Sequence, residues 1–235
     1  MKQENRGLGR RPFLKGVFGI LTGLGVLLSP WFSLVRRCLA ETKRIILPKG
    51  TKRESLIEKN PATLDARNLD ITPLKDFGTM GLDNHREDLD TWRLEVDGHV
   101  TKPIALSYKE ITAMPGIERK VLMICPGFFA NQGLWRGISI GALLKEAGAD
   151  RDITHVTVHG PRGDYSKTER FPIAEILSDK VFLAYQVNGQ ALPVPHGYPL
   201  RVVAEDHYGS EWVKYVFRVT ADKIGEDKVS IMDLP

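Results

Sequence analysis

The chain has 235 residues, 42% of them hydrophobic, and its 33 Lys/Arg and 29 Asp/Glu give a formal net charge of +4. Nine of the basic and two of the acidic residues lie within residues 1–44, which leaves a net charge of −3 over residues 45–235. The basic character therefore belongs to the N-terminal segment, and we expect no nucleic-acid partner. The remaining roughly 190 residues suffice for one domain with a hydrophobic core.

The N-terminus predicts export in the folded state. Arg10-Arg11-Pro12-Phe13-Leu14-Lys15 precedes an uncharged stretch from Gly16 to Val35, and paired arginines ahead of an apolar segment are typical of a twin-arginine signal. This route carries proteins that have already folded, often around a cofactor, so we assign residues 1–40 to the signal and expect a periplasmic location. Residues 16–35 approach the length of a membrane span. Cleavage and retention as an anchor both stay open, as does an ordinary basic membrane anchor.

The rest of the chain reads as one α+β domain with a mixed β-sheet and short helices. Residues 41–70 are polar and patternless, and we interpret 41–75 as a linker or extended arm over the surface, followed by the domain at 76–235. Alternating or continuous apolar runs bounded by turn signals predict strands at 91–98, 121–125, 155–160, 181–187, 200–204 and 212–219. Short helices are predicted at 107–114, 138–147 and 172–177.

Three local signals support these assignments. Ser107 and Glu110 have the spacing of a capping box, which opens the first helix. Ser139 is suited to cap the second helix, and Gly148 to end it. Asn188-Gly189 is the strongest short-range hairpin signal, and it follows the strand at 181–187 directly.

Cys125 is the only cysteine after residue 38, so no intrachain disulfide is expected within the domain. It ends the apolar run Val121–Ile124, and Pro126-Gly127 then directs the backbone out of the sheet into a loop. The thiol is thus expected where a buried strand meets an opening, a place that suits a soft metal ligand or a nucleophile. A small buried hydrophobic residue is the alternative interpretation.

A second cluster lies near the C-terminus, at residues 196–201 and 206–214. Arg201 and Lys214 are able to hold a phosphate, and His196 to hydrogen-bond a heterocycle; a solvated surface loop is the alternative. The sequence contains no H-E-x-x-H, C-x-x-C, EF-hand or G-x-G-x-x-G motif. This argues against zinc or calcium sites and a Rossmann dinucleotide site.

A series of short motifs in a fixed order spans roughly residues 76–222: Trp92…Val96-Asp97-Gly98, Leu106-Ser107, Cys125, Leu134-Trp135-Arg136-Gly137, Leu143-Leu144, Leu183-Ala184-Tyr185-Gln186-Val187-Asn188-Gly189, Leu192-Pro193, His196-Gly197, Pro199-Leu200-Arg201, Tyr208-Gly209 and Val213-Lys214. This series resembles the molybdopterin domain of the sulfite oxidase family. In build it is similar to the periplasmic methionine-sulfoxide reductase catalytic subunits of that family, which also have a twin-arginine leader.

The resemblance implies a sulfite-oxidase-type fold and a molybdenum–molybdopterin cofactor. Cys125 takes the place of the protein thiolate on the metal, and a metal-bound thiol is deprotonated. The resemblance also implies residues that bind the pterin, its phosphate or the substrate. Those toward the cofactor are Asp76, Phe77, His196, Arg201, Trp212, Val213 and Lys214; those toward substrate are Tyr165, which is otherwise a strand-edge aromatic, and an anion clamp drawn from Arg136, Arg162 and Arg170.

The implied activity is two-electron oxygen-atom transfer on a small oxo-acceptor or a sulfoxide- or sulfite-type substrate. Because the chain has no C-x-x-C-H haem site, we expect a separate haem- or quinone-linked electron partner. We also expect the protein to be a monomer or a weak oligomer. The segment Pro126-Gly127-Phe128-Phe129 departs from the family pattern, and the resemblance implies that it lies at the substrate pocket. The alternatives are a non-catalytic binding module, or a cysteine-nucleophile enzyme with His196 or His159 as base.

Overall fold

The structure is a computed structural model, and it describes residues 44–223. The predicted export signal at 1–40, with the anchor segment 16–35, lies outside the described residues. Within 44–223, no helix has the length and apolar character needed to cross a bilayer.

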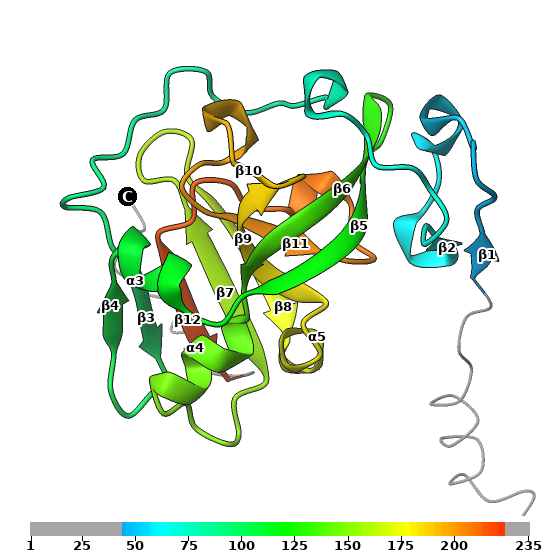
Figure 1. Ribbon diagram of the computed structural model, residues 1–235. Helices are drawn as coiled ribbons and strands as arrows, with labels where there is room; N and C mark the ends of the chain where they lie inside the picture. The colour runs from blue at the N-terminus through cyan, green and yellow to red at the C-terminus, as the bar shows by residue number, and fades with distance from the viewer. Residues whose placement is uncertain (1–43, 224–235) are drawn as a thin grey trace, which may run out of the picture. The chain divides into compact units, whose positions relative to one another are not determined.

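Two five-stranded sheets build the domain (Figure 1). The first is antiparallel throughout, and β11 also pairs with β9; its order is β10 (Gln190–Ala191), β9 (Val181–Val187), β6 (Phe129–Ile138) and β5 (Ile117–Cys125), with β11 at Arg201–Ala204. The second is mixed, because β12 runs parallel to β3 and antiparallel to β7. Its order is β4 (Ile104–Leu106), β3 (Leu94–Gly98), β12 (Arg218–Asp222), β7 (His155–Gly160) and β8 (Lys167–Pro172).

Both sheets contribute side chains to one buried cluster, which includes residues of β3, β5, β6, β7, β9, β11 and β12. In β9, six of seven residues are buried, and all four residues of β11 are buried. Such nearly continuous burial is typical of strands that are covered on both faces. The helices are short: α3 (Tyr108–Ala113), α4 (Ile140–Glu146) and α5 (Ile173–Leu177). The expected α+β class with a mixed sheet and short helices is confirmed.

The three local signals are confirmed at atomic detail. Ser107 Oγ accepts from the Glu110 backbone N–H at 3.3 Å, while Glu110 Oε2 accepts from the Ser107 N–H at 2.8 Å. Ser139 Oγ accepts from the Ala142 N–H at 3.2 Å at the start of α4. The Asn188-Gly189 turn, with φ of 52° and 76°, joins β9 to β10.

Two expectations about the sheets were wrong, and the strands β6 and β8 were not predicted. The chain does not leave the sheet in a loop after Cys125, because Pro126-Gly127 forms a tight turn and β6 follows at once. The strand expected at 212–219 begins only at Arg218, since Tyr215 has a left-handed φ of 55° that interrupts extended backbone.

Residues 44–77 form short elements that pack on the β5–β6 hairpin. They comprise β1 (Ile45–Ile46), which pairs in parallel with β2 (Leu64–Asp65), and the 3₁₀ turns η1 (Arg53–Leu56), η2 (Pro61–Thr63) and η3 (Leu74–Asp76). Four leucines of this segment are buried in a cluster with Leu122, Ile124 and Ala130 of the hairpin: Leu47, Leu56, Leu64 and Leu69. The segment therefore covers one face of the strand that ends in Cys125. The domain boundary at residue 75 stays a prediction.

Candidate active site

A cavity of about 430 Å³ opens at the end of β5. Three segments and a few single residues line it: residues 78–82, the β5–β6 turn, five residues of the segment 209–215 (Gly209, Ser210, Trp212, Lys214 and Tyr215), and side chains that include Tyr165, Lys167 and Arg201. Cys125, Arg201, Trp212 and Lys214, which lie up to 89 positions apart in the sequence, thus meet at one cavity. The structure therefore places the predicted thiol and the two predicted basic residues together.

The Cys125 thiol is half-buried at the last position of β5. Burial raises its pKa, while the positive charges of Arg201 and Lys214 act in the opposite direction. Gly209, at the start of η5 (Gly209–Glu211), packs directly against the thiol, and a Cβ at this position would overlap the sulfur. Only glycine lets the backbone approach a potential metal ligand so closely.

Arg201 is a fully buried cation. Its Nη1 donates to the His196 carbonyl oxygen at 3.0 Å, and its guanidinium lies over the rings of Trp135 and Trp212, at 4.9 and 5.4 Å from their centroids. No carboxylate pairs with it anywhere in residues 44–223, and burial lowers its pKa to about 10. A buried charge is costly unless an opposite charge offsets it, so the site calls for an anion from outside the chain.

Lys214 is the second cation of the cavity without an acidic partner in the described part of the chain. Its Nζ donates to Thr79 Oγ1 and to the Pro195 carbonyl oxygen, both at 2.9 Å. Burial, and then the charge of Arg201, lowers its pKa to about 7. Arg201 and Lys214 line the same cavity and together suit a multiply charged anion such as a phosphate.

The pKa of Lys214 predicts an unusual pH dependence of apoprotein stability. The unfolded chain holds this proton up to about pH 10.5, whereas the folded protein releases it above about pH 7. Between these values the unfolded state binds more protons, so the free energy of unfolding rises with pH, by up to about 1 kcal/mol per pH unit. Urea unfolding of wild type and Lys214→Met from pH 6 to 10 isolates this term as the difference in slope. Equal slopes would contradict the buried, unpaired lysine.

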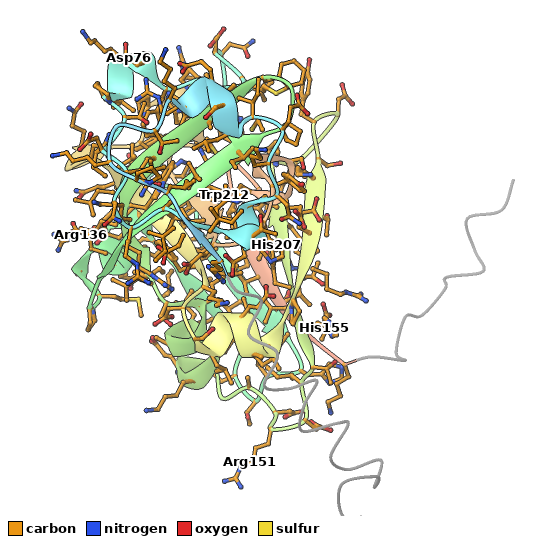
Figure 2. The ribbon with its side chains drawn as sticks, turned by 90° about the vertical axis from the view of Figure 1, so that its right-hand side faces the viewer. Asp76, Arg136, Arg151, His155, His207 and Trp212 are labelled. Carbon is orange, nitrogen blue, oxygen red and sulfur yellow. The ribbon has the colours of Figure 1, made fainter. Side chains whose placement is uncertain are left out.

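The other predicted cofactor residues lie around the cavity rather than in its wall. His196, in η4 (Val194–His196), is buried with its Nδ1 unpartnered, and burial lowers its pKa to about 4, so the ring is neutral at pH 7. Phe77 contacts His196 edge-on at 5.8 Å. Val213 is buried next to Trp212. Asp76 is exposed at the periphery, away from Trp212 in the interior (Figure 2), and does not line the cavity.

The arginines expected to form an anion clamp are not brought to the cavity. Arg136 is exposed on β6 and lies at the edge of the molecule (Figure 2). Arg162 pairs with Glu95 at 2.9 Å, and Arg170 lies 3.9 Å from Asp222. Their chain positions gave no information about the direction in which each side chain points.

The predicted Tyr165 lines the cavity and is 68% exposed there. Sequence reasoning missed several other residues of the wall. Lys167 lies at the cavity, where an arginine was expected. Thr79 binds Lys214, and Met123 Sδ accepts from Arg201 Nη2 at 3.4 Å. Met123 could have been found from the sequence, because it lies two positions before Cys125 and therefore on the same face of the strand.

Two arrangements are absent from residues 44–223. No hydrogen bond joins Cys125 to a histidine; His159 instead faces Thr220 Oγ1 at 3.1 Å. No group of three or more His, Cys, Asp or Glu could hold a metal ion there. A metal bound to Cys125 would therefore need its other ligands from a bound cofactor, because residues 44–223 do not supply them.

The chain is similar to known proteins over most of the described domain. The family described as "Oxidoreductase molybdopterin binding domain" matches residues 82–228. The chain is 30% identical over 132 residues to the uncharacterized oxidoreductase YuiH of Bacillus subtilis, covering 54% of this chain and 65% of YuiH. It is 30% identical over 143 residues to the protein-methionine-sulfoxide reductase catalytic subunit MsrP of Gluconobacter oxydans, covering 54% of this chain and 46% of MsrP. The chain thus spans less than two thirds of these relatives.

A solved structure supports the fold. The sulfane dehydrogenase SoxCD from Paracoccus pantotrophus superimposes with a TM-score of 0.55 at 24% identity, over 59% of this chain and 40% of that one. At this identity the likeness concerns the fold alone. The family match over 82–228 shows that the chain belongs to the sulfite oxidase family of molybdopterin-binding oxidoreductases.

Proposed function

We propose that this oxidoreductase binds one molybdenum–molybdopterin through Cys125 and transfers oxygen atoms to or from a small oxo substrate, in exchange for electrons from a separate carrier. The observation that carries the proposal is the pair of cations, Arg201 and Lys214, which line the same cavity as a free thiol and have no acidic partner among residues 44–223.

The residues present fit this cofactor. Cys125 offers one soft thiolate, the donor type that a high-valent thiophilic metal accepts, and the sulfur donors of the pterin would complete the ligand set that the chain lacks. Arg201 and Lys214 would offset the phosphate charge. The unpartnered Nδ1 of His196 is a buried hydrogen-bonding atom that a pterin ring would satisfy.

The chain's own residues would act mainly by positioning. When bound, the molybdenum supplies a centre that changes oxidation state by two electrons as one oxygen atom is transferred. Cys125 is fixed by the tight turn at 126–127 on one side and by Gly209 on the other. Trp212 covers Arg201 and excludes water from it, which strengthens the attraction between the guanidinium and an anionic cofactor.

Export and partnership belong to the same proposal. The twin-arginine motif at Arg10-Arg11 supports delivery of the loaded protein to the periplasm. The name of the relative MsrP, a catalytic subunit, supports a separate haem- or quinone-linked partner here. Replacement of Arg10-Arg11 by two lysines should leave the protein in the cytoplasm; unchanged periplasmic accumulation would refute the export route.

Turnover tests the proposed activity. Protein from cells that make the cofactor is assayed with a reduced viologen against a panel of sulfoxides and N-oxides, and with an oxidised carrier against sulfite. We expect turnover of at least one oxo compound, with a rate proportional to bound molybdenum. A molybdenum-loaded protein that is inert toward the whole panel in both directions would overturn the proposal.

A further inference from the structure

The mouth of the cavity carries an unusual concentration of exposed apolar side chains. Six large hydrophobic residues are exposed in the described part of the chain, and three of them line this one cavity: Met80, Phe128 and Tyr165, at 66%, 68% and 68% exposure. They come from three separate segments, so their meeting is not a consequence of sequence neighbourhood. Exposed apolar side chains gathered at the mouth of a cavity mark a contact surface for a ligand or partner. We call these three residues the apolar collar.

Phe128 is held in place by the turn that follows the thiol. Its backbone N–H donates to the Cys125 carbonyl oxygen at 3.0 Å, and Gly127 has a φ of 77°. Proline followed by glycine with positive φ, closed by this hydrogen bond, is the pattern of a type II turn. Pro126 restricts the turn further, because its ring fixes φ. The ring of Phe128 is therefore presented to solvent on a rigid support, three residues from the proposed metal ligand.

The charges around the cavity argue against an inorganic oxyanion as the substrate. Three cations line the cavity, and two of them, Arg201 and Lys214, are the buried pair assigned above to the cofactor. The third, Lys167, is paired with Glu169 at 2.7 Å. A small oxyanion loses strong hydration when it enters an apolar opening and needs an available cation to offset that loss. An uncharged substrate has no such requirement.

We propose that the apolar collar, and Phe128 in particular, selects an uncharged organic oxo compound with an apolar substituent over small inorganic oxyanions. This rests on the proposed function. The substituent packs against the collar while the oxygen points toward the metal. In the reductive direction a sulfoxide gives up its oxygen, takes two electrons from the one-electron carrier and two protons from water, and leaves as the thioether with one molecule of water.

Paired substrates and matched variants test this. We compare kcat/KM of the holoenzyme for methyl phenyl sulfoxide and dimethyl sulfoxide in wild type, Phe128→Ala and Phe128→Leu. The control is Leu177→Ala on α5, because Leu177 is also 68% exposed and does not line the cavity. We expect Phe128→Ala to lower kcat/KM for the phenyl substrate about tenfold and for the dimethyl substrate less than twofold. Phe128→Leu should lie between wild type and Phe128→Ala, and Leu177→Ala should match wild type.

A binding measurement separates this proposal from the proposed function. Methyl phenyl sulfone, which resembles methyl phenyl sulfoxide in shape, is titrated into the holoprotein by calorimetry in the absence of turnover. Phe128→Ala should raise the Kd of this analogue about tenfold. An unchanged Kd and unchanged substrate ratio would overturn the collar even if the enzyme is active. A higher kcat/KM for sulfite or nitrate than for the sulfoxides would also overturn the collar. The same holds if Phe128→Ala impairs only electron delivery, with an equal loss for both sulfoxides, because the surface would then bind the electron carrier. Inertness toward all oxo compounds with intact sulfone binding would instead count against the proposed function alone.

Discussion

Replacement of Cys125 by serine is expected to remove molybdenum from the protein and to lower turnover by more than about a hundredfold, since it exchanges the one thiol that the described residues offer at the cavity for a hard hydroxyl. Serine is nearly isosteric with cysteine and Cys125 is only half-buried, so the fold should persist. Molybdenum per polypeptide, thiolate-to-metal absorption and turnover are measured on protein purified in parallel.

The control for this variant is the thermal midpoint. A Cys125→Ser protein that melts within a few degrees of apo wild type has lost a ligand and not its fold. Retention of molybdenum and activity by this folded variant would contradict the assignment. Retained metal without activity would contradict it as well, because a residue that only shapes the pocket would then explain the loss.

Arg201→Met is expected to separate cofactor retention from folding. The variant should lose bound pterin, because methionine cannot offset an anionic phosphate. Its apoprotein should change in free energy of unfolding by no more than about 1–2 kcal/mol, since relief of the buried charge opposes the loss of hydrogen bonds to the carbonyl oxygens of His196 and Val202. Pterin fluorescence after oxidation and urea unfolding of the apoprotein measure the two effects.

Arg119 provides the matched control. Its guanidinium donates to Glu205 and to the Asp179 carbonyl oxygen, both at 2.6 Å, and it does not line the cavity. Arg119→Met should therefore lower stability, because it leaves the carboxylate of Glu205 without its partner, and should leave pterin content per folded protein unchanged. If Arg201→Met destabilised the apoprotein by much more than Arg119→Met while keeping its pterin, Arg201 would be a structural residue and not a cofactor anchor.

Much of the fold could be predicted where local sequence decides local structure. The capping box at Ser107 and the hairpin at Asn188-Gly189 depend on neighbours a few residues away, and both are confirmed. The strand β6 could not be predicted, because it buries Asn131 and Gln132. Distant backbone groups bind both amides: Asn131 binds Gly78, and Gln132 Nε2 donates to the Ala66 carbonyl oxygen, while Gln132 Oε1 is buried without a partner. Without those partners in view, a strand with buried amides does not look like core.

The site shows the same division. Cys125, Arg201 and Lys214 could be proposed because their motifs lie in the order of a known family, and the structure brings them to one cavity. The predicted arginine clamp is not found at the cavity, because the sequence around an isolated arginine does not indicate where its side chain points. Phe128 and Met80 form the collar only through the tertiary fold, and no local pattern distinguishes them from core residues.

Quantitation of molybdenum and pterin per polypeptide, in protein exported by cells that make the cofactor, decides whether Cys125 and Arg201 hold a molybdenum–pterin group. We expect one molybdenum and one pterin for each chain, and loss of both when Cys125 and Arg201 are replaced together. Protein that contains neither, yet turns over an oxo substrate, would contradict this expectation.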